Sequence, residues 1–213
     1  MKGLFISGAG TDVGKTYVAL HLIKILNKKY QVKARKPIES DCEKSPSGLI
    51  PKDAKLLSEA CNNKEPLEKV CKFRFEACVS PEKAIDDKKV TITSSMLVAA
   101  CKTESAKDFV VVEGAGGIYS PIAKKTLNID IAKELGLPIV LIIKDELGAI
   151  NQALLSVHAA QQQELKVAMI VLNQITTNSL DNNKAISAYT KVPVVSFSED
   201  NLKSFEDDIE RLV

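Results

Sequence analysis

The chain has 213 residues, of which 45% are hydrophobic and 26% are charged, and its 29 basic and 27 acidic residues leave a net charge of +2. A chain of this size and composition can bury a sizeable core, as globular proteins do. The two signs of charge are mixed along the sequence instead of forming a basic tract, which argues against a nucleic-acid partner.

Nothing in the sequence indicates export or a membrane. The segment Met1–Ser7 has too few apolar residues for a signal peptide, and the longest apolar run, Leu137 to Ile143, is far shorter than a membrane span. The cysteines are odd in number, form no C-x-x-C pair and are accompanied by only two histidines, which leaves no familiar zinc-site spacing. We therefore expect a cytoplasmic protein with reduced thiols and no membrane partner.

Short β-rich runs alternate with helical patterns along the chain. The predicted strands are Leu4–Ser7, Val32–Arg35, Phe109–Glu113, Ile139–Ile143, Ala168–Asn173 and Val192–Phe197. The predicted helices cover about 15–28, 53–62, 94–106, 127–135, 149–163, 179–190 and 200–212. Three strands are continuously apolar, as parallel strands covered on both faces are. The pattern predicts an α/β fold, a doubly wound and mostly parallel sheet with helices on both faces, in one domain over residues 1–213.

The stretch 36–93 is the irregular part of the chain. It holds five prolines with charged residues between them. It is too long for an ordinary connection, and insertions of this kind often carry substrate contacts.

A glycine-rich loop joins the first predicted strand to the first predicted helix, with the sequence Gly8-Ala9-Gly10-Thr11-Asp12-Val13-Gly14-Lys15-Thr16. Strand, loop, Gly-Lys-Thr and helix are the context that a phosphate-binding P-loop requires. Backbone N–H groups would surround the phosphates, Lys15 would reach the β- and γ-phosphates, and the Thr16 hydroxyl would hold a magnesium ion. Ala9 stands where the first glycine of the usual pattern falls, so the loop is a variant. The alternative is a glycine-rich turn without a ligand.

A second candidate element is the strand and glycine run from Phe109 to Gly117. A buried strand there delivers Glu113 to the carboxyl edge of the sheet, where ligands bind in such folds. Glu113 could then act on magnesium, and the glycines after it would let the backbone approach a ligand closely. The alternative for Glu113 is a solvated acid at the end of a strand.

Seven segments, taken in order, resemble dethiobiotin synthetases. The loop GAGTDVGKT is similar to the family's G-T-D-T-x-V-G-K-T, and Val112–Gly117 is nearly identical to its V-E-G-A-G-G. The remaining matches are Lys36–Ser40 to K-P-V/I-x-S-G, Ser47–Ala54 to G-L-x-x-x-D-A, Val79–Pro81 to an S-P loop, Leu147–Ala153 to L-G-x-I-N-H-A, and Val171–Asn173 to V-x-N. The resemblance spans residues 3 to about 175 and implies a P-loop NTPase-like fold.

The resemblance also implies the reaction. It is the closure of a cyclic urea that depends on ATP and Mg²⁺, in biotin biosynthesis. In this reaction 7,8-diaminopelargonate takes up CO₂ as a carbamate, the carbamate attacks the γ-phosphate, and the second amine closes the ring. The carbamate, the phosphoryl group and the carboxylate of the substrate are all anionic, so cations and N–H donors should converge on the site.

The resemblance assigns roles to individual residues. Thr16, Asp53 and Glu113 would hold magnesium, while Lys15, Lys36 and Thr11 would act on the carbamate and the γ-phosphate. The nucleotide would be bound by Gly8, Gly10, Thr11, Asp12, Val13, Gly14, Lys15, Thr16, Glu113, Gly116 and Asn173. The substrate would be bound by Thr11, Lys36, Ser40, Ser80, Pro81, Gly117, Leu147, Gly148 and Asn151. The segment from Leu147 to Asn151 would receive the carboxylate tail of a substrate held by a partner subunit, which implies a homodimer.

Several positions depart from the family pattern. Gly10 replaces an aspartate, Asp12 a common glutamate, and Asp41 the glycine after Ser40. The region after the last predicted strand lacks the family's G-x-I-P turn and the segment that covers the nucleobase. We therefore hypothesise that base recognition rests largely on Asn173 and that other nucleoside triphosphates are accepted.

Three alternatives stay open at this point. A ParA/MinD-like ATPase switch would carry an extra lysine early in the loop, and here no lysine precedes Lys15 in the loop. Such a protein would also need a basic segment at 199–211 to bind a membrane, whereas this segment is rich in acids. An amidotransferase for a cobalamin precursor would need a glutaminase domain, for which we expect no room. A non-catalytic nucleotide-binding module is the third alternative.

Overall fold

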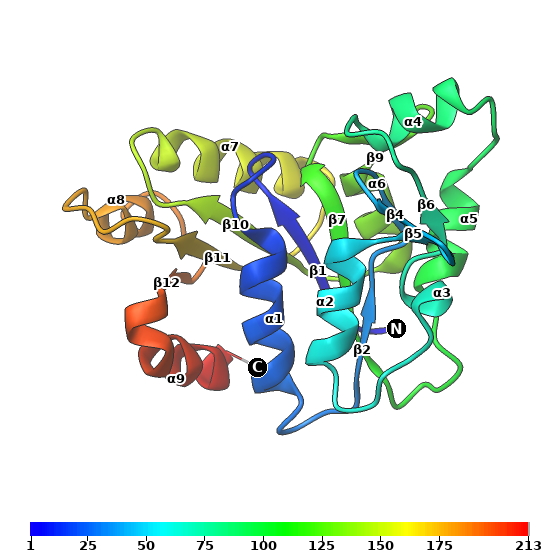
Figure 1. The fold of residues 1–213 in the computed structure, drawn as a ribbon. Helices are drawn as coiled ribbons and strands as arrows, with labels where there is room; N and C mark the ends of the chain where they lie inside the picture. The colour runs from blue at the N-terminus through cyan, green and yellow to red at the C-terminus, as the bar shows by residue number, and fades with distance from the viewer. Residues whose placement is uncertain (213) are drawn as a thin grey trace.

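The computed structural model describes residues 1–212. Its main sheet runs β12-β11-β10-β1-β7-β2, with every neighbouring pair parallel (Figure 1). The strands are β1 (Lys2–Gly8), β2 (Val32–Arg35), β7 (Phe109–Gly117), β10 (Ile139–Lys144), β11 (Val167–Asn173) and β12 (Val194–Phe197). All six lie where the sequence predicts a strand, which confirms the parallel α/β architecture.

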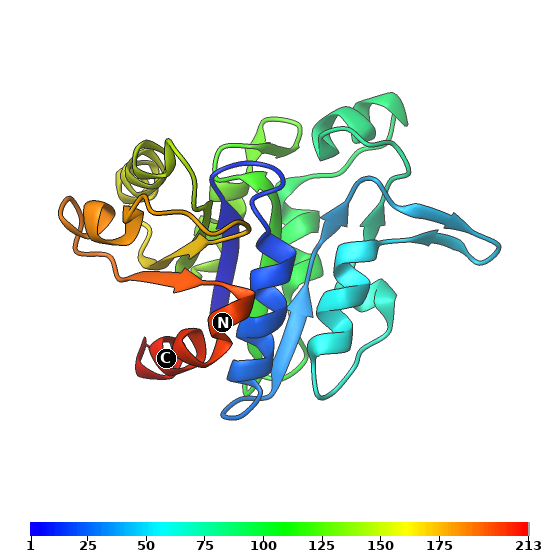
Figure 2. The same ribbon diagram turned by 60° about the vertical axis from the view of Figure 1, so that its left-hand side comes forward.

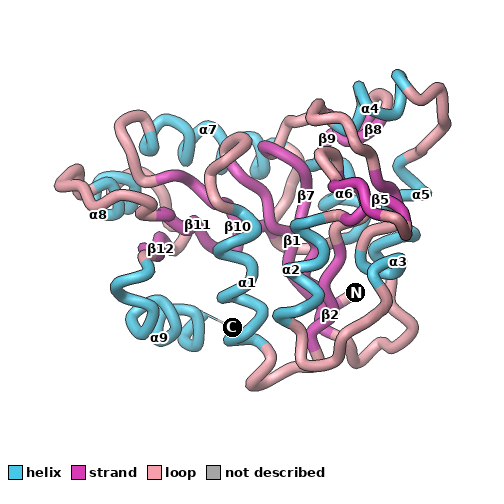
Figure 3. The backbone as a smooth tube through the Cα atoms, in the orientation of Figure 1, coloured by secondary structure: helices cyan, strands magenta, loops and turns pink. Residues whose placement is uncertain are grey.

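Helices cover both faces of this sheet (Figure 3). On one face lie α1 (Lys15–Leu26), α2 (Lys52–Ala60) and α9 (Leu202–Leu212); on the other lie α5 (Ser94–Cys101), α6 (Asn128–Leu135), α7 (Ala149–Gln162) and α8 (Asn182–Ser187). Successive residues of β1 enter different cores: Ile6 packs with the α1 side and Phe5 with the α6 side. Because both faces are buried, the strands need apolar residues at every position.

The segment 36–93 contains more regular structure than predicted. Only the helix at 53–62 was expected there, and it appears as α2. The further elements are β3 (Ile38–Glu39), β4 (Glu43–Ser45), β5 (Gly48–Ile50), α3 (Leu67–Val70), β6 (Phe73–Arg74) and α4 (Pro81–Asp87). The hairpin of β4 and β5 projects from the body of the molecule (Figure 2). Elements of two to seven residues are too short to show a clear hydrophobic period, so sequence patterns did not reveal them.

Some predicted boundaries were wrong. The helix expected at 94–106 ends at Cys101, because Lys102 is extended at ψ 150°. The helix expected at 179–190 is confined to α8, the last strand begins at Val194, and a 3₁₀ turn, η1 (Glu199–Asn201), precedes α9. A small two-stranded sheet of β8 (Pro121–Ala123) and β9 (Thr126–Leu127) follows β7 and was not predicted.

The cysteines and the two histidines occupy ordinary structural positions. All five cysteines within residues 1–212 are free, and only Cys78 is exposed. His21 packs against Tyr17 and Phe197, and burial lowers the pKa of its imidazole. His158 is exposed on α7. Over the same residues, no helix combines the length and apolar character of a membrane span.

The order of strands reverses around β1. The chain leaves β1 for β2, returns to β7 beside β1, and then crosses to β10 on the opposite side. Ligands of open α/β sheets bind at such a reversal, outside the carboxyl ends of the strands. The loops that follow β1 and β7 lie at that edge.

Candidate active site

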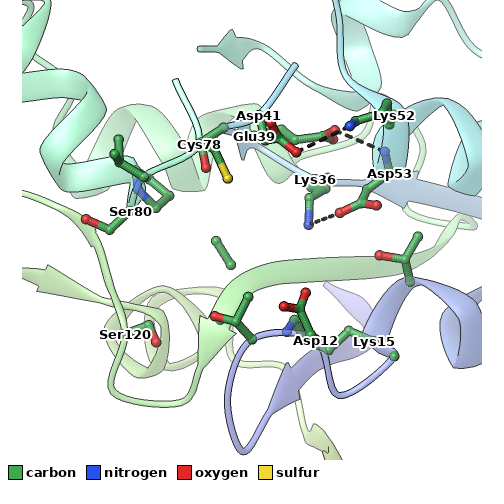
Figure 4. A pocket seen from close by; sticks show the side chains of 18 of the residues that line it. Asp12, Lys15, Lys36, Glu39, Asp41, Lys52, Asp53, Cys78, Ser80 and Ser120 are labelled. Carbon is green, nitrogen blue, oxygen red and sulfur yellow. Dashed lines mark hydrogen bonds and ion pairs between the residues drawn. The ribbon is translucent and has the colours of Figure 1, made fainter. Parts of the chain in front are cut away.

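A cavity of about 900 Å³ opens at the carboxyl edge of β1, β2 and β7 (Figure 4). Eleven of the residues that the sequence singled out line it: Thr11, Asp12, Gly14, Lys15, Thr16, Lys36, Ser40, Asp53, Ser80, Pro81 and Gly116. They come from the phosphate loop (residues 8–16), the segment after β2, the start of α2, the start of α4 and the glycine run (residues 114–117) at the end of β7. Figure 4 shows Lys36 and Asp53 facing Lys15 and Asp12 across the cavity.

The phosphate loop curls as its glycines allow. Gly14 has φ +83°, in the left-handed region that glycine adopts at little cost, and Asp12 has φ +58°. The first turn of α1 has neither an acidic residue nor a side-chain cap, so its N–H groups remain available for an anion. Lys15 is only 8% exposed and its Nζ donates to the Gly10 carbonyl at 2.8 Å. Burial lowers the pKa of this ammonium group.

A buried cluster of charges lies beside the loop. Lys36 Nζ donates to Glu113 Oε1 at 2.6 Å and lies 3.3 Å from Asp53 Oδ2. Thr16 Oγ1 donates to the same Glu113 oxygen at 2.9 Å. Burial opposes the charged form of Lys36, but the carboxylates of Glu113 and Asp53 outweigh it and raise its pKa. The two carboxylates therefore favour the charged form of Lys36 at the wall of the cavity.

The same cluster offers oxygen ligands to a divalent ion. The second carboxylate oxygen of Glu113 is buried and has no hydrogen-bond partner, an arrangement that needs explaining in a folded protein. No group of three His, Cys, Asp or Glu residues within 1–212 could hold a metal by itself. Mg²⁺ is usually held by one or two carboxylates together with water and substrate phosphates. Thr16, Asp53 and Glu113 fit that mode of binding.

Two residues outside the predicted site shape the glycine run at the end of β7. Asn128, at the start of α6, is fully buried; its Oδ1 accepts from the Ala115 N–H, and its Nδ2 donates to the carbonyls of Ala115, Gly117 and Ser120. Ser120 Oγ accepts from the Gly117 N–H at 2.8 Å. An asparagine at the start of a helix gives no sequence signal for this role, because its partners are brought in by the fold.

Gly116 is required by this geometry. Its φ is +75°, and a Cβ atom would lie 2.6 Å from Ser120 Oγ. A side chain would therefore disturb the wall that faces Thr11.

The other predicted site residues do not line the cavity. Gly8 ends β1, Gly10 and Val13 belong to the loop between β1 and α1, Glu113 and Gly117 lie within β7, and Leu147, Gly148 and Asn151 lie at the start of α7. Leu147 is 89% exposed and Gly148, at φ +98°, is the N-cap of α7. Asn173 ends β11 beneath the loop, where it is 4% exposed and donates from Nδ2 to the Val13 carbonyl at 2.9 Å.

Known proteins resemble this chain over its whole length. A family model described as an AAA domain matches residues 2–198. A curated ATP-dependent dethiobiotin synthetase BioD from Vesicomyosocius okutanii is 53% identical over 213 residues, covering 100% of this chain and 97% of the relative. The protein of that name from Ruthia magnifica is 50% identical, covering 100% of this chain and 99% of the relative.

Solved structures of much lower sequence identity share the fold. A ParA family ATPase from Chlorobium tepidum superposes with a TM-score of 0.55 at 11% identity, covering 100% of this chain and 92% of the other. A plasmid partition protein from Borrelia burgdorferi gives 0.59 at 10% identity, with coverage of 100% and 96%. At such low identity these likenesses concern the fold alone. By sequence, the chain belongs to the ATP-dependent dethiobiotin synthetase family.

Proposed function

We propose that the chain catalyses the ATP-dependent ring closure of 7,8-diaminopelargonate with CO₂ to dethiobiotin, a ligase reaction of biotin biosynthesis, on one domain over residues 1–213. The observation that carries this proposal is the convergence of Lys15, Lys36 and Asp53 at one cavity, with Glu113 hydrogen-bonded to Lys36 behind the cavity wall. The identity of 53% to a curated dethiobiotin synthetase supports it.

The residues of the cavity suit a reaction of anions. One amine of the substrate takes up CO₂ as a carbamate, whose oxygen attacks the γ-phosphorus as ADP leaves. The second amine then attacks the carbamoyl carbon, loses a proton and expels phosphate as the ring closes. Lys15 and Lys36 neutralise the charge on the phosphoryl group and the carbamate, and Thr11 and Ser40 orient the carbamate. Phosphoryl transfer needs positioning and charge neutralisation above all, which this arrangement supplies.

Magnesium would be held by Thr16, Asp53 and Glu113. When bound, the ion neutralises charge on the β- and γ-phosphates. The unpartnered oxygen of Glu113 is the feature of the chain that supports this assignment. Lys36 stays protonated between the two carboxylates and keeps their negative charges from repelling the nucleotide.

The start of α7 supports a homodimer that shares its sites. The turn before α7 exposes Leu147, and α7 lacks a side-chain cap and acids in its first turn. Such a helix start can receive a carboxylate. In the proposal, the substrate tail of a partner subunit binds there, near Gly148 and Asn151. The five free thiols are in keeping with a cytoplasmic enzyme.

The decisive experiment is an assay of the purified chain with diaminopelargonate, bicarbonate, Mg²⁺ and ATP. We expect a cyclic urea product, identified by mass spectrometry, with one phosphate released for each ring closed. ATP hydrolysis that proceeds equally without the diamine, and without a urea product, would instead indicate a plain ATPase.

Nucleobase selectivity is expected to be weak. Asn173 is nearly buried, and its Nδ2 is already engaged by the Val13 carbonyl, which leaves less of the side chain for a base. The C-terminal helix α9 buries Phe205 and Ile209 in the core beside α1 instead of covering the cavity. We expect kcat/KM to be of similar size for ATP, GTP and CTP. A preference for ATP above about a hundredfold, roughly 2.7 kcal/mol, would contradict this prediction.

A further inference from the structure

Glu39 is a buried acid of the cavity that was not among the predicted site residues. It belongs to the short strand β3, is 4% exposed and lines the same cavity as Lys36. Both of its carboxylate oxygens are hydrogen-bonded: Oε1 accepts from the Asp53 backbone N–H at 3.0 Å, and Oε2 accepts from the Ala54 N–H at 2.9 Å. Glu39 therefore binds the first turn of α2 from a different segment of the chain.

The first turn of α2 has no cap of its own. The residue before the helix is Pro51, whose side chain cannot accept a hydrogen bond, and no side-chain cap is formed locally. Asp53 and Ala54 are the second and third residues of the helix, the positions whose N–H groups a capping side chain normally satisfies. The Glu39 carboxylate takes both, and its negative charge lies at the positive end of the helix dipole.

This contact connects the two halves of the charge cluster. Lys36 lies three residues before Glu39 on the segment that follows β2, whereas Asp53 is carried by α2. One of the two amides that donate to Glu39 is that of Asp53, whose carboxylate lies 3.3 Å from Lys36 Nζ. Any loosening of the first turn of α2 would thus move Asp53 relative to Lys36 and Glu113.

We propose that Glu39 is a positioning residue: it fixes the first turn of α2 so that the Asp53 carboxylate faces Lys36 and the magnesium position. The proposal rests on the proposed function, which assigns Asp53 to magnesium. Glu39 acts through Asp53 and the backbone of α2, without touching the reacting atoms.

The test compares Glu39→Gln and Glu39→Ala with the unaltered enzyme. In the metal-free protein, amide hydrogen exchange at Asp53 and Ala54 should accelerate in Glu39→Ala, and less in Glu39→Gln, which keeps one acceptor oxygen. The Mg²⁺ concentration for half-maximal ring closure should rise about tenfold in Glu39→Ala, as for other residues that orient metal ligands. Binding of Mn²⁺ with ATP, followed by electron paramagnetic resonance, should weaken in parallel, while kcat at saturating Mg²⁺ changes little.

A matched control is Thr93→Ala. Thr93 caps α5 by accepting from the Met96 N–H at 3.3 Å, and this helix does not line the cavity. We expect Thr93→Ala to lower the melting temperature without changing the Mg²⁺ requirement. Unchanged exchange at Asp53 and Ala54 in Glu39→Ala, or an unchanged Mg²⁺ requirement, would overturn the positioning role. An unaltered enzyme that makes no urea would instead refute the proposed function.

Discussion

Replacing Lys36 with alanine should reduce kcat for ring closure by on the order of a thousandfold, about 4 kcal/mol of transition-state stabilisation. The Lys36 ammonium is buried, stays protonated and is the only cation in residues 1–212 that hydrogen-bonds to Glu113. Its loss removes a fixed positive charge from the place where we expect the carbamate and the γ-phosphate to react. Single-turnover measurements of urea formation at saturating ATP would separate this effect from product release.

The same substitution should also weaken the fold. Without Lys36, the buried carboxylate of Glu113 is left without its 2.6 Å ion pair, which commonly costs about 3 kcal/mol of unfolding free energy. Denaturant unfolding and circular dichroism would show whether the variant is folded under assay conditions. A suitable control is Lys69→Ala, because the exposed ion pair of Lys69 with Glu104 lies outside the cavity. A folded Lys36→Ala enzyme with a rate near that of the unaltered protein would refute the assigned role.

Replacing Gly14 with alanine should damage both the fold and nucleotide binding. A Cβ atom at this position would lie 2.1 Å from Asn173 Nδ2, and the backbone φ of +83° disfavours any side chain. The collision pushes Asn173 away from the Val13 carbonyl that it holds at 2.9 Å. We expect a loss of about 2–3 kcal/mol in unfolding free energy. We also expect a large loss of ATP affinity, measurable by calorimetry.

Gly10→Ala is the matched control in the same loop. A Cβ atom there meets nothing within 4 Å, and the φ of Gly10 is not positive. We expect its stability to stay within about 0.5 kcal/mol of the unaltered protein. Adding Asn173→Ala to Gly14→Ala removes the colliding group and should recover part of the lost stability. If Gly14→Ala and Gly10→Ala were equally mild, the close packing of loop and Asn173 would not matter.

The sequence alone determined the sheet and the chemical character of the site. A continuously apolar strand needs cover on both faces, and that requirement is visible within five or six residues, so β7, β10 and β11 were predictable. The phosphate loop was predictable for a similar reason, because strand, glycines, Lys15, Thr16 and helix are adjacent in the chain. Lys36 and Asp53 became candidates only through their place in an ordered set of motifs.

Tertiary structure alone decided how these groups meet. Glu39 reaches the amides of residues 53 and 54, and Asn128 reaches back to Ala115 and Gly117, across intervals that have no period and no fixed length. The strand pair of β3 and β6 joins residues about 35 positions apart in the same way. Hydrophobic periodicity reports which face of an element is buried. It carries no information about which distant backbone N–H or carbonyl a polar side chain will find there, because that partner is set by the packing of the elements.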